Sequence, residues 1–193
     1  MIEEEEFDYN HDLADRMKFN DPQFVTSYAK EIFNFCKDAE DKFPPRYGYM
    51  AIRQKDINEK MRAILIDWLV DVHMKFNLRQ ETLYLTVNII DRFLEKVEIT
   101  RSKLQLVGVA AMLISCKYEE IYSPEVKDFA YITDNAFTRS EVLQMEGKIL
   151  SVLEFNLLHH SILLFQERLG HLANGTEKPL MLSKYICELS LIE

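Results

Sequence analysis

The chain has 193 residues, enough for one domain or for one domain and part of another. Hydrophobic residues make up 48% of it and charged residues 28%, as in a soluble globular protein, and the longest uncharged run, Leu104 to Cys116, is too short to cross a bilayer. The formal net charge of −9 disfavours binding to nucleic acid or to an anionic membrane, and weakly favours a basic partner surface.

The cysteines Cys36, Cys116 and Cys187 lie far apart and show no spacing typical of a disulfide framework or of a metal site. Two of them fall inside apolar runs. This pattern predicts reduced, buried thiols in an intracellular protein.

The N-terminal part of the chain divides into a tail and a helix with its connector. Residues 1–20 are polar and acidic, which predicts a disordered tail. Asp21 suits an N-cap and Pro22 the first helical position, so a helix is expected to begin there and to end before Pro44. Residues 21–57 are therefore interpreted as an N-terminal helix followed by a connector.

Residues 58–157 predict one all-α domain. Apolar residues at helical spacing indicate helices over 58–76, 81–97, 100–120, 123–133 and 138–155. The expected N-caps are Asn58, Thr100, Ser123 (followed by Pro124) and Thr138, which forms a capping box with Glu141. The third helix is apolar on all sides between Leu104 and Cys116, so we expect it to be the central buried helix of the domain.

Residues 158–193 restart the pattern. They predict a helix over 159–172, a loop over 168–179 that contains Gly170, and a helix over 180–193. Because two helices cannot enclose a core, we interpret them as the start of a second, incomplete domain.

The first of the five helices carries two apolar faces where a surface helix needs one. Met61, Ile64, Leu65 and Trp68 share one face, and Ile66, Leu69 and Val70 lie on the other. The second face either packs inside the protein or binds a partner, and the spacing alone does not decide between them.

Charged residues stand out at two further places. Glu119 and Glu120 lie at the C-terminal end of a predicted helix, where negative charge is unfavourable by about 0.3–1 kcal/mol. Arg62 and Asp91 lie within apolar helices, and since a buried charge needs a partner, they are predicted to pair. The sequence contains no phosphate-binding glycine loop, no metal-ligand motif and no nucleophile elbow, so an enzyme is the least favoured class.

The sequence closely resembles the cyclin box of A- and B-type mitotic cyclins in MRAILIDWLVDV, ETLYLTVNIIDRFL, KLQLVGVAAMLISCKYEEIYSPEV and FAYITDNAFTRSEVLQMEGKIL. The resemblance begins near Pro22. KFNLRQETLYLTVNIIDRFL and SCKYEEIYSPEVKDFAYITDN resemble the B-type more closely, and Asp71 departs from the A-type, which has Glu. The resemblance implies an all-α, five-helix cyclin box around a central buried helix, preceded by an N-terminal helix and followed by the first two helices of a second, truncated box.

The same resemblance implies a non-enzymatic regulatory subunit of a cyclin-dependent protein kinase that controls mitosis, with no catalytic residue, cofactor or metal. Its kinase-binding residues are Ile32, Phe35, Ile114, Lys117, Tyr118, Glu120, Ile121, Glu146, Leu150, Phe155 and Leu157. Its groove for Arg-x-Leu peptides of substrates and inhibitors comprises Met61, Ile64, Leu65, Trp68, Asp71, Leu104 and Gln105, and its structural ion pair is Arg62 with Asp91.

The implied location is the nucleus and cytoplasm, and neither nucleic acid nor membrane is expected as a partner. The alternative is a cyclin-box adaptor in transcription, against which the net charge of −9 argues.

Overall fold

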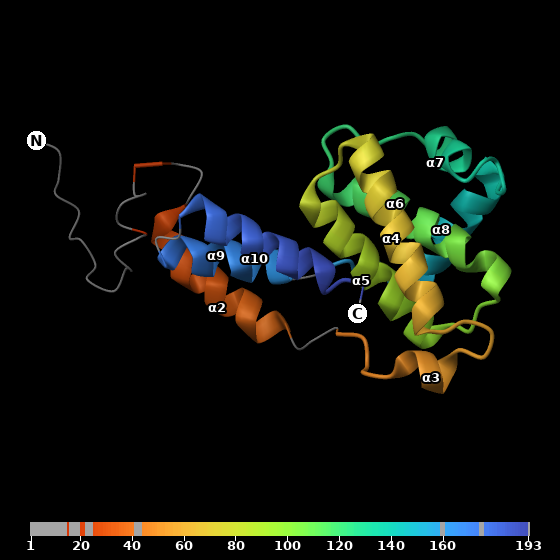
Figure 1. Ribbon diagram of the computed structural model, residues 1–193, viewed down its shortest axis with the longest axis horizontal. Helices are drawn as coiled ribbons and strands as arrows, with labels where there is room; N and C mark the ends of the chain where they lie inside the picture. Colours follow the sequence, from red (N-terminus) through yellow and green to blue (C-terminus); the bar gives the residue numbers. More distant parts are fainter. Residues whose placement is uncertain are drawn as a thin grey trace, which may run out of the picture.

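The computed structural model describes Asp15, Asn20, Asp21 and residues 25–40, 44–158, 161–173 and 176–192. Throughout this part of the chain the regular structure is helical and contains no strand, which confirms the predicted all-α class (Figure 1). In chain order the elements are η1 (Thr26–Tyr28), α2 (Ala29–Glu40), α3 (Tyr49–Arg53), α4 (Glu59–Phe76), α5 (Gln80–Lys96), η2 (Arg101–Lys103), α6 (Leu104–Glu119), α7 (Val126–Ile132), α8 (Arg139–Val152), α9 (Ile162–Leu172) and α10 (Glu177–Leu189).

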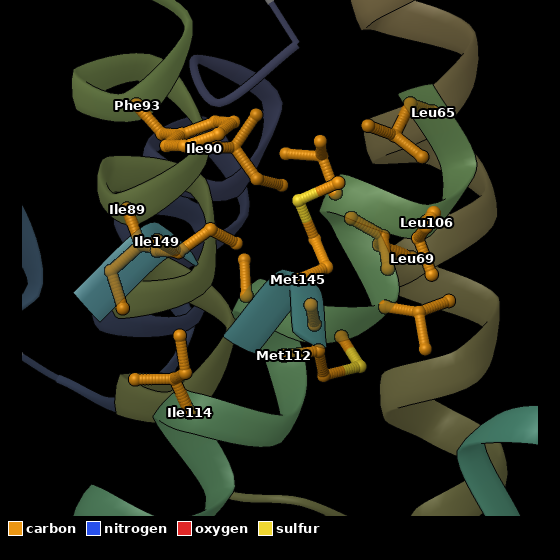
Figure 2. Packing of buried hydrophobic residues seen from close by; sticks show 14 of the residues in the cluster. Leu65, Leu69, Ile89, Ile90, Phe93, Leu106, Met112, Ile114, Met145 and Ile149 are labelled. Carbon is orange, nitrogen blue, oxygen red and sulfur yellow. The ribbon is translucent and has the colours of Figure 1, made fainter. Parts of the chain in front are cut away.

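Helix α6 forms the centre of the main domain, as its apolar sequence predicted. Every residue from Leu104 to Cys116 is buried except the half-buried Gln105. α6 packs against α4, α5, α7 and α8. Figure 2 shows part of the resulting core, in which Met112 of α6 lies among Leu69 of α4 and Met145 of α8. Burial of this apolar surface is the main force that holds the helices together.

A close approach between α4 and α6 depends on Gly108. A Cβ atom at this position would lie 2.8 Å from Cδ1 of Leu65, closer than packed carbon atoms come. The absence of a side chain at Gly108 therefore makes room for Leu65 and allows α4 to pack closely against the central helix.

A second group of helices consists of α2, α9 and α10, which lie side by side in Figure 1. The rings of Phe33 and Phe165 meet edge to face at 5.7 Å and join α2 to α9. Tyr84 of α5 packs with Leu163 and Cys187, and this small cluster attaches α9 and α10 to the main domain.

The N-terminal tail lies outside the described residues except at Asp15 and Asn20. Asp15 is buried and forms a two-pronged ion pair with Arg168 of α9, so the prediction of disorder is wrong at this residue. The start of the N-terminal helix also differs from the prediction: Pro22 lies outside the described residues, Val25 is not helical, and the helical segment that contains α2 starts with η1 at Thr26.

Two of the predicted helix caps are confirmed. The Asn58 side chain accepts a hydrogen bond from the Met61 N–H at 3.0 Å, and Thr138 and Glu141 form the expected capping box of α8. Both caps are local patterns whose partners lie within one helical turn, so they can be read from spacing alone.

Other predicted boundaries were wrong. The cap of α7 is Glu125, which forms a capping box with Asp128, in place of Ser123. Thr100 does occupy an N-cap position, that of the short helix η2 which leads into α6, but its side chain makes no capping bond. The expected connector contains the helix α3, and Pro179 lies inside the first turn of α10, where a missing N–H costs nothing.

Candidate partner-binding surfaces

An ion pair joins the end of α6 to the middle of α8. The Nζ of Lys117 lies 2.6 Å from Oε1 of Glu146. The Lys117 side chain is 47% exposed, whereas that of Glu146 is only 12% exposed. The lysine lies in the last turn of α6, where a positive charge is favourable. The ion pair forms within the chain itself and needs no partner.

Several apolar side chains predicted for the kinase surface are exposed. Tyr118 and Ile121 follow Lys117 at the end of α6, and Phe155 lies just beyond α8. Tyr122 is also exposed, although no sequence pattern singled it out. A contiguous group of exposed apolar residues is a usual mark of a protein interface, whereas single scattered ones are ordinary.

Three residues assigned to this surface are less accessible than Tyr118, Ile121 and Phe155. Ile114 is 2% exposed and lies in the core, because it belongs to the part of α6 that is surrounded on all sides (Figure 2). Leu150 and Leu157 are half-buried and pack against the same core.

Ile32 and Phe35 are exposed, but they lie on α2, which packs on α9 through Phe33. In Figure 1, α2 lies beside α9 and α10, in the other group of helices from α6 and α8. A kinase surface that includes both groups would therefore extend over two parts of the molecule.

Glu120 has an internal role that the sequence did not reveal. Its Oε1 accepts hydrogen bonds from the Arg79 N–H at 2.8 Å and from the Thr82 hydroxyl at 2.5 Å. These donors lie at the N-terminal end of α5, where a carboxylate satisfies free N–H groups and the helix dipole. The charge that is unfavourable for α6 is thus favourable for α5, a helix that begins 40 residues earlier in the chain.

Glu119 has no comparable compensation. Burial, followed by the charge of Glu81, raises the pKa of its carboxyl above the ordinary value, and the charge of Glu120 contributes in the same direction. A raised pKa means that the carboxylate form costs stability at neutral pH, and that this cost disappears as the pH falls through the raised value.

We therefore expect Glu119→Gln to raise the melting temperature at pH 7. The gain should shrink as the pH is lowered through the raised pKa, because the wild-type carboxyl then also becomes neutral. Thermal unfolding monitored by circular dichroism over a pH series measures this, with Asp67→Asn, an exposed carboxylate on α4, as the control. A gain that stays constant with pH would contradict this origin.

The first stripe of α4 lies only partly at the surface. Ile64 is 62% exposed, Met61 and Trp68 are half-buried, and Asp71 is exposed. Leu65, however, is 6% exposed because it packs on Gly108, so its assignment to an open surface was wrong.

The flanking residues divide in the same way. Leu104 is buried and Gln105 half-buried, and Val70, on the other face of α4, is half-buried as well. The accessible apolar residues of this stripe are therefore Met61, Ile64 and Trp68, whereas Leu65 and Leu104 are buried.

Arg62 and Asp91 form a bidentate ion pair between α4 and α5. Arg62 Nε lies 2.6 Å from Asp91 Oδ1, and its Nη2 lies 2.7 Å from Oδ2. Burial disfavours the charge on Arg62, but Asp91 outweighs this effect, so the pKa of the guanidinium is raised.

Further groups join this pair. Tyr49 donates its hydroxyl hydrogen to Asp91 at 2.7 Å, and Arg62 Nη1 donates to the carbonyl oxygens of Leu191 at 3.1 Å and Ile192 at 3.3 Å. The pair thus links α3 and the residues that follow α10 to the main domain. The sequence suggested the pair but gave no signal for Tyr49 or for the two carbonyl groups.

The described side chains include no cluster of His, Cys, Asp and Glu that could hold a metal ion. No helix in the same part of the chain is both long and apolar enough to cross a membrane. The surfaces described above are suited to binding other proteins.

Comparison with known proteins places these features in a family. The model of the N-terminal domain of cyclins matches residues 31–158. A solved structure of a viral cyclin from herpesvirus saimiri is 26% identical, with a TM-score of 0.74, over 84% of this chain and 72% of that one. The chain belongs to the cyclin family, which confirms the fold predicted from the sequence.

Within that family the similarity is to B-type mitotic cyclins. The chain is 48% identical over 180 residues to the G2/mitotic-specific cyclin-B2 of Oryzias latipes, which covers 93% of this chain and 46% of that relative. It is 49% identical over 172 residues to the G2/mitotic-specific cyclin-B of Spisula solidissima, which covers 89% of this chain and 40% of that relative. The predicted B-type resemblance is confirmed, and the chain spans less than half the length of these curated relatives.

Proposed function

We propose that this chain is a regulatory subunit that binds and activates a cyclin-dependent serine/threonine protein kinase in the control of mitosis. The observation that carries this proposal is the preformed Lys117–Glu146 ion pair, 2.6 Å long, at the end of α6, with Tyr118 and Ile121 exposed beside it. A charged pair next to exposed apolar side chains provides both orientation and affinity at an interface. The similarity to G2/mitotic-specific cyclins favours this role over that of a transcription adaptor.

The mechanism follows from what phosphoryl transfer requires of a kinase. The αC glutamate of a protein kinase must pair with the lysine on strand β3, and the activation loop must be ordered. A rigid partner that packs against αC stabilises this arrangement relative to the inactive one, and so shifts the population of kinase molecules. In this proposal the chain contributes only packing and charge, and no catalytic group.

The proposal is tested with immobilised full-length chain and a cell extract. We expect it to retain a protein kinase that phosphorylates histone, identified by mass spectrometry of the bound fraction. Purified kinase catalytic subunit should then gain activity when the chain is added. Retention of transcription factors without kinase activity would favour the adaptor function and overturn the proposal.

A second proposed surface recruits substrates and inhibitors that contain an Arg-x-Leu sequence. Ile64 and Trp68 would contact the apolar residue of such a peptide, and Asp71 would receive its arginine. Support comes from the exposure of Ile64 and Asp71 on the same helix, seven residues apart and therefore on one face.

We expect Ile64→Ala to weaken binding of an Arg-x-Leu peptide with little change in stability, because Ile64 is 62% exposed. Leu65→Ala should instead lower the free energy of unfolding by about 2–5 kcal/mol, since it opens a cavity on the central helix.

Fluorescence titration of Trp68, the only tryptophan, measures peptide binding, and thermal unfolding measures stability. Met74→Ala, which truncates another exposed apolar residue of α4, is the matched control. Equal binding by the Ile64→Ala and Met74→Ala variants would remove this surface from the proposal.

For the location of the protein we propose the nucleus and cytoplasm, where a mitotic kinase acts. The three cysteines are free and buried, which is compatible with a reducing compartment. Imaging of a fluorescent fusion through the cell cycle tests this location.

A further inference from the structure

The end of α8 has a strained backbone. Glu154 and Phe155 have φ values of 53° and 56°, in the left-handed region that favours glycine. The helix closes with two hydrogen bonds: the Phe155 N–H donates to the Leu150 carbonyl at 2.9 Å, and the Glu154 N–H to the Ser151 carbonyl at 3.2 Å. This is the Schellman arrangement, in which the left-handed residue is usually glycine.

The C-terminal ends of two other helices, α4 and α7, also enter the left-handed region, but with residues that tolerate it. The left-handed position after α4 is Asn77, and those after α7 are Asp134 and Asn135. Asn and Asp adopt this conformation readily, whereas a bulky Phe does so only when its surroundings impose it. Sustained strain of this kind is characteristic of binding and active sites.

Arg92 of α5 is the side chain that holds this turn from the interior. Its residue is 5% exposed, and its Nη2 donates to the carbonyl oxygen of Asn156 at 2.9 Å. The Asn156 N–H in turn donates to the carbonyl of Leu153 at 2.9 Å. One turn further along α5, Lys96 reaches the Val152 carbonyl at 3.5 Å. Cationic donors therefore satisfy the carbonyl groups at and beyond the C-terminal end of α8.

The strain is not offset by burial of the aromatic ring. Phe155 is 72% exposed, so the left-handed turn places a large apolar side chain in solvent. In a molecule without partners this arrangement costs stability twice, in backbone strain and in exposed apolar surface. A partner that covers the ring would recover the second cost.

We infer that Arg92 is a positioning residue that holds the strained Glu154–Phe155 turn in the shape that presents Phe155 to the kinase. This inference rests on the proposed function, in which Phe155 belongs to the kinase-binding surface. Arg92 itself is buried and acts through the Asn156 carbonyl.

The test uses Arg92→Met in the full chain, which keeps an unbranched stem and removes the donors. Amide hydrogen exchange at Phe155 and Asn156 should accelerate while exchange in α6 stays protected. Affinity for a purified cyclin-dependent kinase catalytic subunit should fall about tenfold, because the turn no longer prefers the bound shape. Lys96→Met, which removes an exposed donor to the same helix end, is the matched control and should have a much smaller effect.

Rescue separates positioning from a merely structural role. Glycine adopts the left-handed region at little cost, so adding Glu154→Gly to Arg92→Met should slow exchange at Asn156 again and recover most of the affinity. In a Phe155→Ala background, Arg92→Met should change the affinity no further, because the ring through which it acts is absent. A second loss of similar size there would overturn the inference.

The outcomes distinguish this inference from the proposed function. If the wild-type chain binds no kinase, the proposed function fails, while hydrogen exchange still decides whether Arg92 holds the turn. If Arg92→Met does not fold, Glu154→Gly alone decides: the inference expects greater stability and unchanged affinity. Lower stability of that variant, or unaltered exchange at residues 155 and 156 in Arg92→Met, would overturn the inference.

Discussion

Lys117→Ala is expected to reduce activation of the kinase strongly at concentrations where the wild-type chain just saturates it. Affinity should fall by about 30-fold or more, the loss expected when a hot-spot residue worth about 2 kcal/mol is truncated. Lys117 is exposed and its removal opens no cavity, so the domain should remain folded. Glu146→Ala should have the same effect on binding. Kinase activity and calorimetric titration at matched folded concentrations give both quantities.

The burial of Glu146 calls for a second variant. Because its side chain is only 12% exposed, truncating Lys117 leaves a carboxylate with little solvent, which adds a structural cost to the loss of binding. Exchanging the two charges, Lys117→Glu with Glu146→Lys, keeps the internal pair and reverses the charges that a kinase would meet. We expect the exchanged variant to fold like wild type and still fail to bind.

Lys184→Ala provides the comparison with an ordinary ion pair. Lys184 lies 3.0 Å from Glu167, and both side chains are substantially exposed. Such pairs contribute about 0–1 kcal/mol, so this variant should bind and activate the kinase normally. Activation by the charge-exchanged variant equal to that of wild type would show that the kinase does not recognise this pair.

Features within one helix could be predicted from the sequence, because their signals are local. The burial of α6 follows from its uninterrupted apolar residues, and the caps at Asn58 and Thr138 follow from spacing within one turn. The family resemblance supplied the candidate surfaces, since no single stretch carries chemistry that points to a kinase.

Features that depend on tertiary contacts could not be predicted. Leu65 and Ile64 are neighbours with similar side chains, yet Gly108, more than 40 positions away, accommodates one of them in the core. Glu120 looked unfavourable because its compensating partner, the start of α5, is adjacent only in space. The left-handed turn at Glu154 and Phe155 gave no sequence signal, since the position that is usually glycine in such a helix end is occupied by Glu154.

Arg62→Ala should lower the free energy of unfolding by about 3–5 kcal/mol, because it leaves the Asp91 carboxylate charged, buried and without its cation. Both oxygens of Asp91 bind Arg62 at 2.6 and 2.7 Å, and the two side chains are 12% and 10% exposed, so water compensates little. Urea unfolding with constant slope measures the change.

Tyr49→Phe separates the charge from the hydrogen bond. It removes one donor to Asp91 and keeps the ion pair, so its cost should be smaller, about 1.5–3 kcal/mol. Arg62→Lys keeps the charge but cannot reproduce the bidentate geometry. Its loss of unfolding free energy should lie between those of Tyr49→Phe and Arg62→Ala.

The double variant Arg62→Ala with Asp91→Ala decides whether the two residues act as a pair. If they do, its loss should be clearly smaller than the sum of the two single losses, because no unpaired charge remains inside. Hydrogen exchange adds a spatial readout: Arg62 also donates to the carbonyls of Leu191 and Ile192, so exchange near the end of α10 should accelerate in every Arg62 variant. Additive losses, with unchanged exchange there, would mean that α10 is held by other contacts and that Arg62 and Asp91 stabilise the domain independently.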